Sequence, residues 1–333
     1  MWTGRVGNDM WTGGLDGAHS PHAGLPLPTA ELPHARLEIL PQTGLAITPG
    51  SPYNRPEEPF CYDFKSARGG EGMKRREMDG YRNTDPWALS PEQVRQYEAD
   101  GFVVLHAYLD PQTVGALARG TEELARRVGP IRPGTPRIQV DRIGEEYHLR
   151  MIEPVVDLCE TFARLAADER VTGLFQSLFG EQPVLFEDKV NYKQPKGGTP
   201  FPMHQDFPYW QKYSPRLASA LIYIDEATEA NGCLEVARGW HQKGLLPDHA
   251  VNVGLMTDSH CLREPIDPSQ TVKVPGPPGT LILFSAFTPH ASAPNLSDRP
   301  RRAIILTYNP ASDGDVYQER YGLVLSKPSA LTT

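Results

Sequence analysis

The sequence predicts a mainly β protein with flanking helices, arranged as a cupin-like jelly roll. Helical patterns come first along the chain, and short strands dominate from Pro183 onward. The strands are separated by turns rich in Gly and Pro, a pattern typical of antiparallel sheets that pack face to face. The chain has 333 residues, which favours one catalytic domain with an extension over two domains of equal size.

The N-terminal segment differs in composition from the rest of the chain. Residues 1–83 are rich in Gly, Pro, His and Ser, and Met-Trp-Thr-Gly occurs at both Met1 and Met10. Such a segment buries too little apolar surface to offset the entropy of its chain. We therefore expect residues 1–83 to be extended or disordered and residues 84–333 to form the domain. The alternative is an arm that packs on the core or on a second subunit, with Arg36–Ile47 as an edge strand.

Three helices are predicted from capping signals. Ser90, Pro91 and Gln93 form a capping-box pattern, in which the Ser and Gln side chains satisfy free backbone N–H groups. Gly101 tolerates the left-handed conformation that ends a helix. The expected helices are 91–100, 111–127 with Asp110 as its cap, and 154–178 with a break near Asp168.

Apolar runs between turn residues predict the strands. Asn231–Gly232 is a strong hairpin signal because both residues tolerate positive φ. Cys233, in the run that follows, is interpreted as a small core residue. The expected strands are Phe102–His106, Val184–Lys193, Leu217–Ile224, Gly232–Val236, Thr271–Val274, Thr280–Ser285 and Ala303–Tyr308.

A His-x-Asp pair, His204-Gln205-Asp206, follows one of these strands. Side chains alternate in direction along an extended backbone, so the imidazole and the carboxylate are expected on one side. His290 supplies a second imidazole from a distant strand. Two histidines and one carboxylate form the ligand set of non-haem Fe(II) oxygenases, which leaves other metal positions open for a co-substrate and O₂. We therefore predict His204, Asp206 and His290 as iron ligands.

Arg301 lies eleven residues after His290. Its guanidinium is planar and always charged, which suits a carboxylate. A metal triad followed by a carboxylate anchor indicates 2-oxoglutarate as the co-substrate. Arg302 is the rival for this role, but only one of two adjacent side chains on a strand faces inward. Arg150 is a weaker candidate for a second cationic contact, with a surface position as the alternative.

The charge of the chain argues against a nucleic-acid partner. The formal net charge is −8, and no basic stripe emerges that would neutralise phosphates. No apolar run is long enough to span a bilayer, and the N-terminus lacks the apolar core of a signal peptide. The four cysteines are scattered without a C-x-x-C pair, which favours a reduced protein. We expect a soluble, cytoplasmic enzyme that acts on a small molecule as a monomer or a homodimer.

From about Leu89 to Tyr308 the chain resembles the phytanoyl-CoA dioxygenase family of Fe(II)- and 2-oxoglutarate-dependent oxygenases. The resemblance implies a double-stranded β-helix, the jelly roll of that family. One departure is visible, because this chain has Arg238-Gly-Trp-His241 where the family usually has Pro-Gly-Ser/Thr-His. We interpret that change as affecting the substrate rim rather than the chemistry. The matching motifs are His204-Gln-Asp206, Asn231-Gly-Cys-Leu234, Gly239-Trp-His241, Gly279-Thr-Leu-Ile-Leu-Phe284, and His290 with Arg301.

The resemblance also implies how the predicted residues act. The iron ligands match His204, Asp206 and His290, and the keto acid end of 2-oxoglutarate fills two further metal positions. The far carboxylate of 2-oxoglutarate meets the arginine that matches Arg301. Related halogenases carry a small residue in place of the carboxylate ligand, so Asp206 favours hydroxylation over chlorination. The implied reaction hydroxylates an unactivated C–H of a metabolite and releases succinate and CO₂.

Further residues near the motif are candidates for ligand contacts. Lys189 and Asn191 are two apart on a strand and share a face, and by resemblance they contact the co-substrate. The alternative for Lys189 is a solvated position on the sheet surface. Phe207, Tyr209 and Trp210 follow the ligand pair directly and are candidates for the wall of a substrate pocket, with core packing as the alternative.

Other functions compatible with these residues stay open. Desaturation, ring formation and epoxidation use the same iron ligands. A cupin-like metalloenzyme that does not use 2-oxoglutarate is the main alternative, and a catalytically silent binding module is another. An amino-acid-like or secondary-metabolite substrate is favoured over a CoA ester, because no basic patch for a nucleotide phosphate is evident.

We predict that residues 1–83 are dispensable for the chemistry. A chain that begins near Thr84 is expected to bind Fe(II) and 2-oxoglutarate as the whole chain does, because the leader carries no proposed ligand. Metal and co-substrate titrations of the two chains test this, and limited proteolysis should remove the leader first. Insolubility of the shortened chain, or loss of co-substrate binding, would show that the leader is part of the fold.

Overall fold

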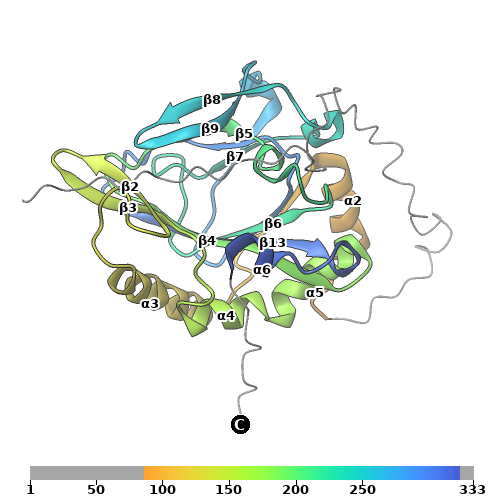
Figure 1. The fold of residues 1–333 in the computed structure, drawn as a ribbon. Helices are drawn as coiled ribbons and strands as arrows, with labels where there is room; N and C mark the ends of the chain where they lie inside the picture. Colours follow the sequence, from red (N-terminus) through yellow and green to blue (C-terminus); the bar gives the residue numbers. More distant parts are fainter. Residues whose placement is uncertain (1–85, 323–333) are drawn as a thin grey trace, which may run out of the picture. The chain divides into compact units, whose positions relative to one another are not determined.

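The computed structural model describes residues 86–322. Two antiparallel sheets face each other, and helices cover the outer face of the larger one (Figure 1). The strands of the larger sheet are β1 Phe102–Leu105, β2 Ile138–Ile143, β3 Glu146–Ile152, β4 Pro183–Lys193, β6 Ala218–Tyr223, β11 Leu281–Ser285 and β13 Arg301–Pro310. They lie in the order β1-β11-β6-β13-β4-β3-β2.

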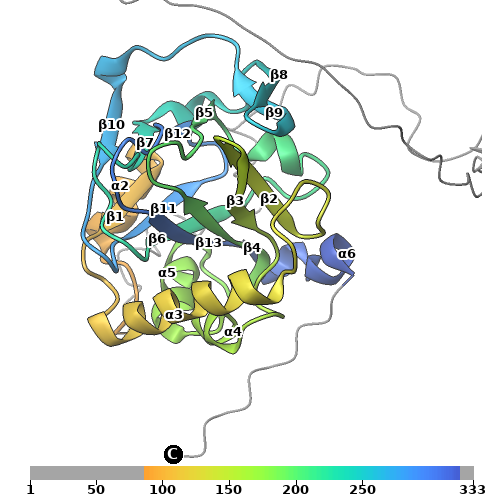
Figure 2. The same cartoon turned by 90° about the vertical axis from the view of Figure 1, so that its left-hand side faces the viewer.

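The smaller sheet has the order β10-β7-β12-β5 and lies above the larger one (Figure 2). A separate hairpin of β8 and β9 lies on the same side (Figure 1). This two-sheet arrangement confirms the mainly β jelly roll predicted from the sequence. The bounds are β5 Phe201–His204, β7 Leu234–Ala237, β8 Asp248–Val253, β9 Met256–Leu262, β10 Thr271–Val274 and β12 His290–Ser292.

The helices begin and end largely where their caps predict. Ser90 and Gln93 form the expected capping box, and Gly101 ends the first helix with φ of 85°. Asp110 accepts a hydrogen bond from the backbone of Thr113 at the start of the second helix. The described helices are α2 Pro91–Asp100, α3 Pro111–Arg127, α4 Glu160–Ala166, α5 Glu169–Phe179 and α6 Tyr317–Tyr321. Helices α3, α4 and α5 lie below the larger sheet in both views (Figures 1 and 2).

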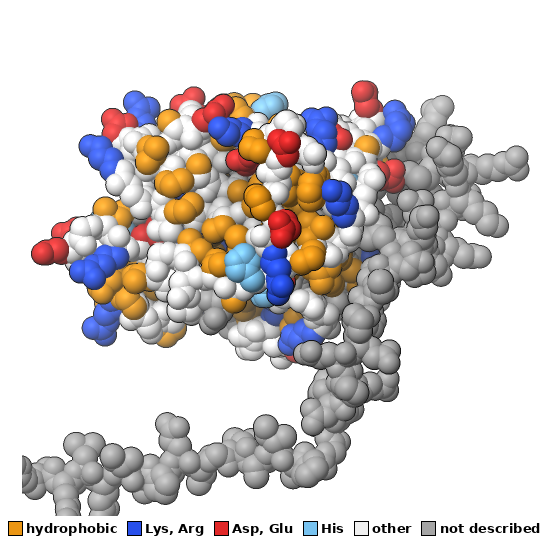
Figure 3. All heavy atoms as spheres, turned by 90° about the horizontal axis from the view of Figure 1, so that it is seen from above, with side chains coloured by type: hydrophobic (Ala, Val, Ile, Leu, Met, Phe, Trp, Pro, Cys, Tyr) orange, Lys and Arg blue, Asp and Glu red, His pale blue; other side chains and the backbone are white. Residues whose placement is uncertain are grey.

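Alternate residues of the central strands enter two different cores. On β6, Ala220 and Ile222 pack with helix residues such as Phe175 below the larger sheet. Leu221 and Tyr223 instead face the space between the two sheets. Because both faces of the strand are covered, its sequence is almost continuously apolar. The face above the smaller sheet mixes hydrophobic side chains with charged ones of both signs (Figure 3).

The predicted helix 154–178 is wrong at its start. Residues Val155 and Val156 donate their backbone N–H groups to the Asp188 carboxylate, and the helix begins only at Glu160. The Asp188 carboxylate on β4 thus holds a turn at residues 155–159 that precedes the helix. The predicted break near Asp168 is confirmed, because this residue caps α5.

Two pairs of strands were not predicted, namely β2 with β3 and β8 with β9. Asn231–Gly232 does turn the chain, and Gly232 has φ of 76°, but the turn does not join a hairpin. The strand before it, β6, belongs to the larger sheet and the strand after it, β7, to the smaller one. The turn thus passes the chain from one sheet to the other. Cys233 is buried between the sheets as expected.

The predictions for residues 1–83, including the alternative edge strand, lie outside the described residues and stay predictions. None of the described helices is both long and apolar enough to cross a membrane.

Asp188 is expected to be critical for stability. Its two carboxylate oxygens accept hydrogen bonds from Val155, Val156 and Tyr317, so Asp188→Ala leaves three buried donors without a partner. Each such donor costs about 1–3 kcal/mol, so chemical denaturation should show a loss of at least ~3 kcal/mol. Exposed Asp298 offers a matched control, and Asp298→Ala should change the free energy of unfolding by less than ~0.5 kcal/mol. Equal effects of the two changes would contradict this role.

Candidate metal centre and its cavity

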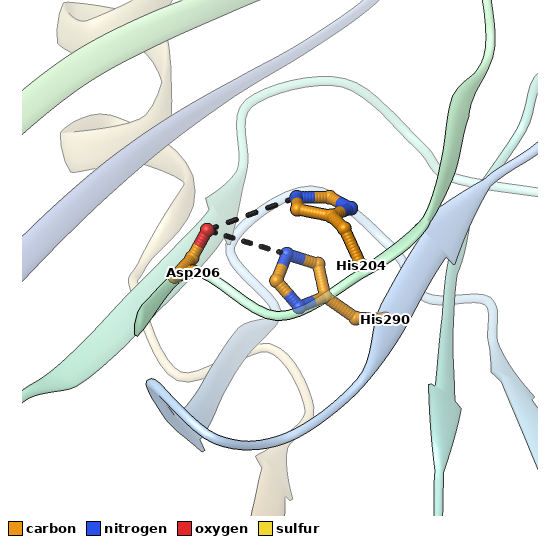
Figure 4. A group of neighbouring side chains, drawn as sticks. All are labelled: His204, Asp206 and His290. Atoms are coloured by element: carbon orange, nitrogen blue, oxygen red, sulfur yellow. Dashed lines mark ion pairs between the residues drawn. The ribbon is translucent and has the colours of Figure 1, made fainter. Parts of the chain in front are cut away.

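Three side chains converge at one end of the smaller sheet (Figure 4). The Nε2 atoms of His204 and His290 lie 3.7 and 3.8 Å from Oδ1 of Asp206. Metal bonds of about 2.1 Å at right angles place ligand atoms roughly 3 Å apart. A small inward movement therefore brings all three atoms to bonding distance, and the group fits a divalent metal.

Strand pairing brings the two histidines together. His290 begins β12, and its Cα partner on the neighbouring strand is His204, the last residue of β5. Asp206 is placed otherwise than the sequence predicted. It lies beyond the strand with φ of −78° and ψ of −31°, just before the 3₁₀ helix Phe207–Trp210. The chain turns after His204, and this turn rather than strand alternation directs the carboxylate toward the imidazoles.

The residue between the two ligands holds this turn in place. Gln205 is buried, and its Oε1 accepts a hydrogen bond from the Leu246 backbone at 2.8 Å. Its Nε2 donates to the carbonyl groups of Phe287 at 2.7 Å and Gly244 at 2.9 Å. Three connections to other segments leave this side chain little freedom. This role of Gln205 was not predicted from the sequence.

The outer nitrogens of both histidines are occupied by backbone carbonyl groups. Nδ1 of His204 lies 2.7 Å from the oxygen of Pro202, and Nδ1 of His290 lies 3.0 Å from that of Thr288. A proton on Nδ1 satisfies these contacts and leaves the lone pair of Nε2 free for a metal. Burial, with His290 nearby, lowers the pKa of His204 to about 4. The imidazole of His204 is therefore neutral at pH 7.

A pair of buried basic side chains lies near the metal centre. Arg301 and Lys193 are Cα partners on β13 and β4, and both are buried. Nη2 of Arg301 donates to the Ser292 hydroxyl at 3.2 Å, and Lys193 donates to the Ser292 carbonyl at 3.2 Å. Among the described residues neither cation forms an ion pair, and Nε of Arg301 has no hydrogen-bond partner. Burial, followed by the charge of Arg301, lowers the pKa of Lys193 to about 6.

The other two arginines considered from the sequence are already paired. Arg302 forms an ion pair with Asp225 at 2.7 Å, while Arg301 lines the cavity next to the triad. Arg150 is on β3 rather than on a surface helix or loop, and it pairs with Asp141 at 3.0 Å with both side chains buried. Arg150 therefore has no free charge for a ligand. Lys193 was not a candidate from the sequence; it continues the alternation of residues 189 and 191, but it is not among the residues that line the cavity.

The triad and Arg301 share one cavity of about 210 Å³. Tyr209 and Trp210 line it, whereas Phe207 is not among its lining residues. The Phe207 ring instead packs on Phe287, with 4.5 Å between the ring centroids. The three aromatic side chains point in different directions because they lie in the 3₁₀ helix after Asp206. Only Tyr209 and Trp210 point into the cavity.

β4 contributes a row of polar side chains to the same cavity. Glu187, Lys189 and Asn191 all line it, because every second residue of a strand has the same direction. Lys189 is not a solvated surface residue, since it is largely buried and forms an ion pair with Glu187. Glu187 also accepts hydrogen bonds from Trp210 at 3.1 Å and from Arg320 of α6.

The departure from the family pattern lies away from the cavity. Gly239 has φ of 75° and donates its backbone N–H to Asp100 at 2.7 Å. His241 lies with Nε2 3.1 Å from the Glu98 carbonyl, and Arg238 forms an ion pair with Asp100 at 3.2 Å. This segment attaches to the end of α2, so the interpretation as a substrate rim was wrong.

Fold and site together define a jelly-roll metalloenzyme whose two-histidine, one-carboxylate centre lies beside a buried arginine, Arg301, for which no ion pair is described. Residues 97–303 match the family model described as Phytanoyl-CoA dioxygenase (PhyH). The chain belongs to the phytanoyl-CoA dioxygenase family. It is an iron- and 2-oxoglutarate-dependent dioxygenase.

Individual relatives agree with this placement. The chain is 31% identical over 234 residues to 2-aminoethylphosphonate dioxygenase from an uncultured bacterium, covering 68% of this chain and 84% of the relative. It is 38% identical over 145 residues to methylphosphonate hydroxylase from Gimesia maris, covering 44% of this chain and 52% of the relative. Among solved structures, EctD from S. alaskensis with 2-oxoglutarate and 5-hydroxyectoine matches with a TM-score of 0.56 and 25% identity, covering 70% of this chain and 79% of that one.

Proposed function

We propose that this enzyme hydroxylates a small metabolite, with Fe(II) bound by His204, Asp206 and His290. The observation that carries the proposal is that this triad and the buried Arg301 line a single cavity. Bound iron supplies the activation of O₂ that hydroxylation of a C–H bond requires. The protein supplies the geometry, because Gln205 and the strand pairing fix the three ligand side chains.

The cationic end of the cavity suits 2-oxoglutarate. Arg301 lines the cavity and presents a buried positive charge that no described carboxylate neutralises, and buried charges are stable only when they are paired. We assign Arg301 as the anchor of the far carboxylate, whereas Lys193 supports Ser292 beside it through its hydrogen bonds. Asn191 lines the same cavity, and its side-chain amide N–H groups are assigned a co-substrate contact, as predicted from the sequence.

The remaining side of the cavity is assigned to the substrate. Tyr209 and Trp210 offer apolar surface that excludes water, and Lys189 lies 5.9 Å from the centre of the Trp210 ring. We therefore move Lys189 from the co-substrate to the substrate side. The cavity has a volume of about 210 Å³ and must also hold 2-oxoglutarate, so it leaves room only for a small substrate. This supports the prediction from the sequence that the substrate is not a CoA ester.

Succinate formation tests the proposal. The purified protein is incubated with 2-oxoglutarate and O₂, with and without Fe(II), and with candidate small molecules. Succinate is expected only with Fe(II). A true substrate should increase the rate of succinate formation and should itself gain one oxygen atom. Product mass spectra separate hydroxylation from desaturation or ring formation. Equal activity with Zn²⁺ and without 2-oxoglutarate would instead favour the cupin-like alternative.

Replacing any one of the three ligands should abolish turnover and leave the fold intact. Each of His204→Ala, Asp206→Ala and His290→Ala removes one of three metal bonds, whereas the sheets that carry these residues are held by separate cores. Iron content and succinate formation are measured together with the thermal unfolding midpoint. The exposed His249 provides the control His249→Ala, which should retain full activity. Full activity of a triad variant at limiting iron would disprove the assignment.

The two adjacent arginines should differ in their effect on 2-oxoglutarate. Arg301→Ala removes a charge-assisted contact worth about 1.5–3 kcal/mol, so the apparent KM for 2-oxoglutarate should rise by roughly 10- to 150-fold. Arg302→Ala breaks the ion pair with Asp225 and should affect stability more than KM. A larger effect of Arg302→Ala on the KM for 2-oxoglutarate would show that Arg302, and not Arg301, binds the co-substrate.

A further inference from the structure

The cavity contains a second group of charged side chains in addition to the metal centre and its cations. Glu153, Glu187, Lys189 and Arg320 all line it, and we call them the charged quartet. They come from the end of β3, from β4 and from α6. Three separate elements therefore bring two carboxylates and two cations into one largely buried cluster.

The two carboxylates of the quartet differ in how many of their oxygens accept hydrogen bonds from the protein. Glu187 accepts hydrogen bonds on both oxygens, from Lys189 on Oε1 and from Trp210 and Arg320 on Oε2. Within the described part of the chain, both hydrogen bonds to Glu153 go to Oε1, from Tyr321 at 2.8 Å and from Arg320 at 3.5 Å. The second oxygen of Glu153 is thus available to a ligand in the cavity.

A further acceptor without a donor lies close by. Oε1 of Gln139 is buried and has no hydrogen-bond partner. Gln139 is the Cα partner of Met151 across β2 and β3, and Glu153 follows Met151 by two residues, just beyond the end of β3. All three residues line the cavity. A buried acceptor without a partner is uncommon in folded proteins, and here it lies beside an incompletely used carboxylate.

The charges of the quartet also favour a ligand that carries a positive group. Burial, followed by the charge of Glu187, raises the pKa of Glu153 to about 7. Despite burial, Glu187 and Glu153 hold the pKa of Lys189 above its ordinary value. The cluster therefore keeps its cations charged and leaves one carboxylate only partly ionised. A ligand with a positive group would supply the charge that Glu153 lacks, and Lys189 has further N–H groups for an anion.

We propose that the substrate is a small molecule with both an ammonium and an oxyanion group. The ammonium binds Glu153 and Gln139, and the oxyanion binds Lys189. This inference rests on the proposed function, because it concerns the substrate of the same cavity. Glu153 then separates amine-bearing substrates from simple oxyanions of the same skeleton. In the alternative, the quartet serves only to fasten α6 to β4 and has no effect on ligand choice.

Matched pairs of probes distinguish the two possibilities. Each pair has one molecule with an amine and one without it: 2-aminoethylphosphonate with ethylphosphonate, β-alanine with propionate, and L-proline with cyclopentanecarboxylate. Binding to the full chain with Fe(II) and 2-oxoglutarate is measured by calorimetry without O₂. In at least one pair the amine-bearing probe is expected to bind at least about tenfold more tightly, and to increase succinate formation once O₂ is admitted.

Glu153→Gln removes the charge and keeps an acceptor for Tyr321, so the fold should persist. The preference for the amine-bearing probe should disappear in this variant, and Glu229→Gln, which changes an exposed carboxylate paired with Lys273, should retain it. Binding of the ammonium favours ionised Glu153, so below its pKa binding releases a proton. Affinity should therefore rise between roughly pH 6 and pH 8 in the wild type. The groups that face Glu153 (Glu187, Lys189, Arg320 and Tyr321) remain in the variant, which should lose this dependence.

The outcomes separate this inference from the proposed function. Titration of 2-oxoglutarate alone into the Fe(II) protein tests the proposed function, and failure there would overturn both. If 2-oxoglutarate binds but the amine-free probes bind equally well, the inference about Glu153 is wrong and the proposed function stands. The same conclusion follows if no probe binds, or if Glu153→Gln retains the preference. A purely structural quartet would lower the unfolding midpoint of Glu153→Gln without changing the ratio of affinities within any pair.

Discussion

The long antiparallel pairing of β4 with β13 is the constraint on which the rest of this molecule depends. The pairing runs from Lys193 opposite Arg301 to Pro183 opposite Pro310. Both faces of these strands are buried, so alternate residues serve two purposes. Odd-numbered residues of β4 such as Lys189 line the cavity, and even-numbered ones such as Asp188 fasten the helical side. A shift of one residue would exchange these two sets, and the cavity and the helix attachment would be lost together.

Local signals in the sequence predicted much of the fold, and non-local pairing explains the errors. The box formed by Ser90 and Gln93 is a contact between near neighbours, and it is present as predicted. By contrast, β2 and β3 carry charged residues that read as surface. Asp141 and Arg150 are buried nevertheless, because they pair with each other. The region after Pro154 was predicted as helix, whereas the turn found there is held by Asp188, which lies far along the chain and has no local signature.

The same distinction applies to the site. A His-x-Asp pair, a distant His and an arginine are few in kind and chemically specific, so the sequence could indicate a metal centre. It could not indicate how Asp206 reaches the metal, because the turn that directs it is held by contacts of Gln205 with remote backbone groups. Glu153 and Arg320 are 167 residues apart. In the sequence each resembles an ordinary surface charge. In the structure the position of α6 brings Arg320 next to Glu153, and both line the cavity.

Charge is distributed unequally along the cavity, and this inequality bears on how it binds two ligands. Arg301 has no described counter-ion, so an anion bound there removes the unfavourable burial of an unpaired charge. The quartet around Glu187 is nearly neutral already, and a zwitterion there mainly exchanges one set of ion pairs for another. The first end therefore gains affinity from any dicarboxylate that reaches the metal. The quartet adds little affinity for a zwitterion. It does select among ligands by the positions of their charges, because each misplaced charge would remain buried without a partner. Co-substrate binding thus depends on net charge, and substrate selection depends on the arrangement of charge around Glu153.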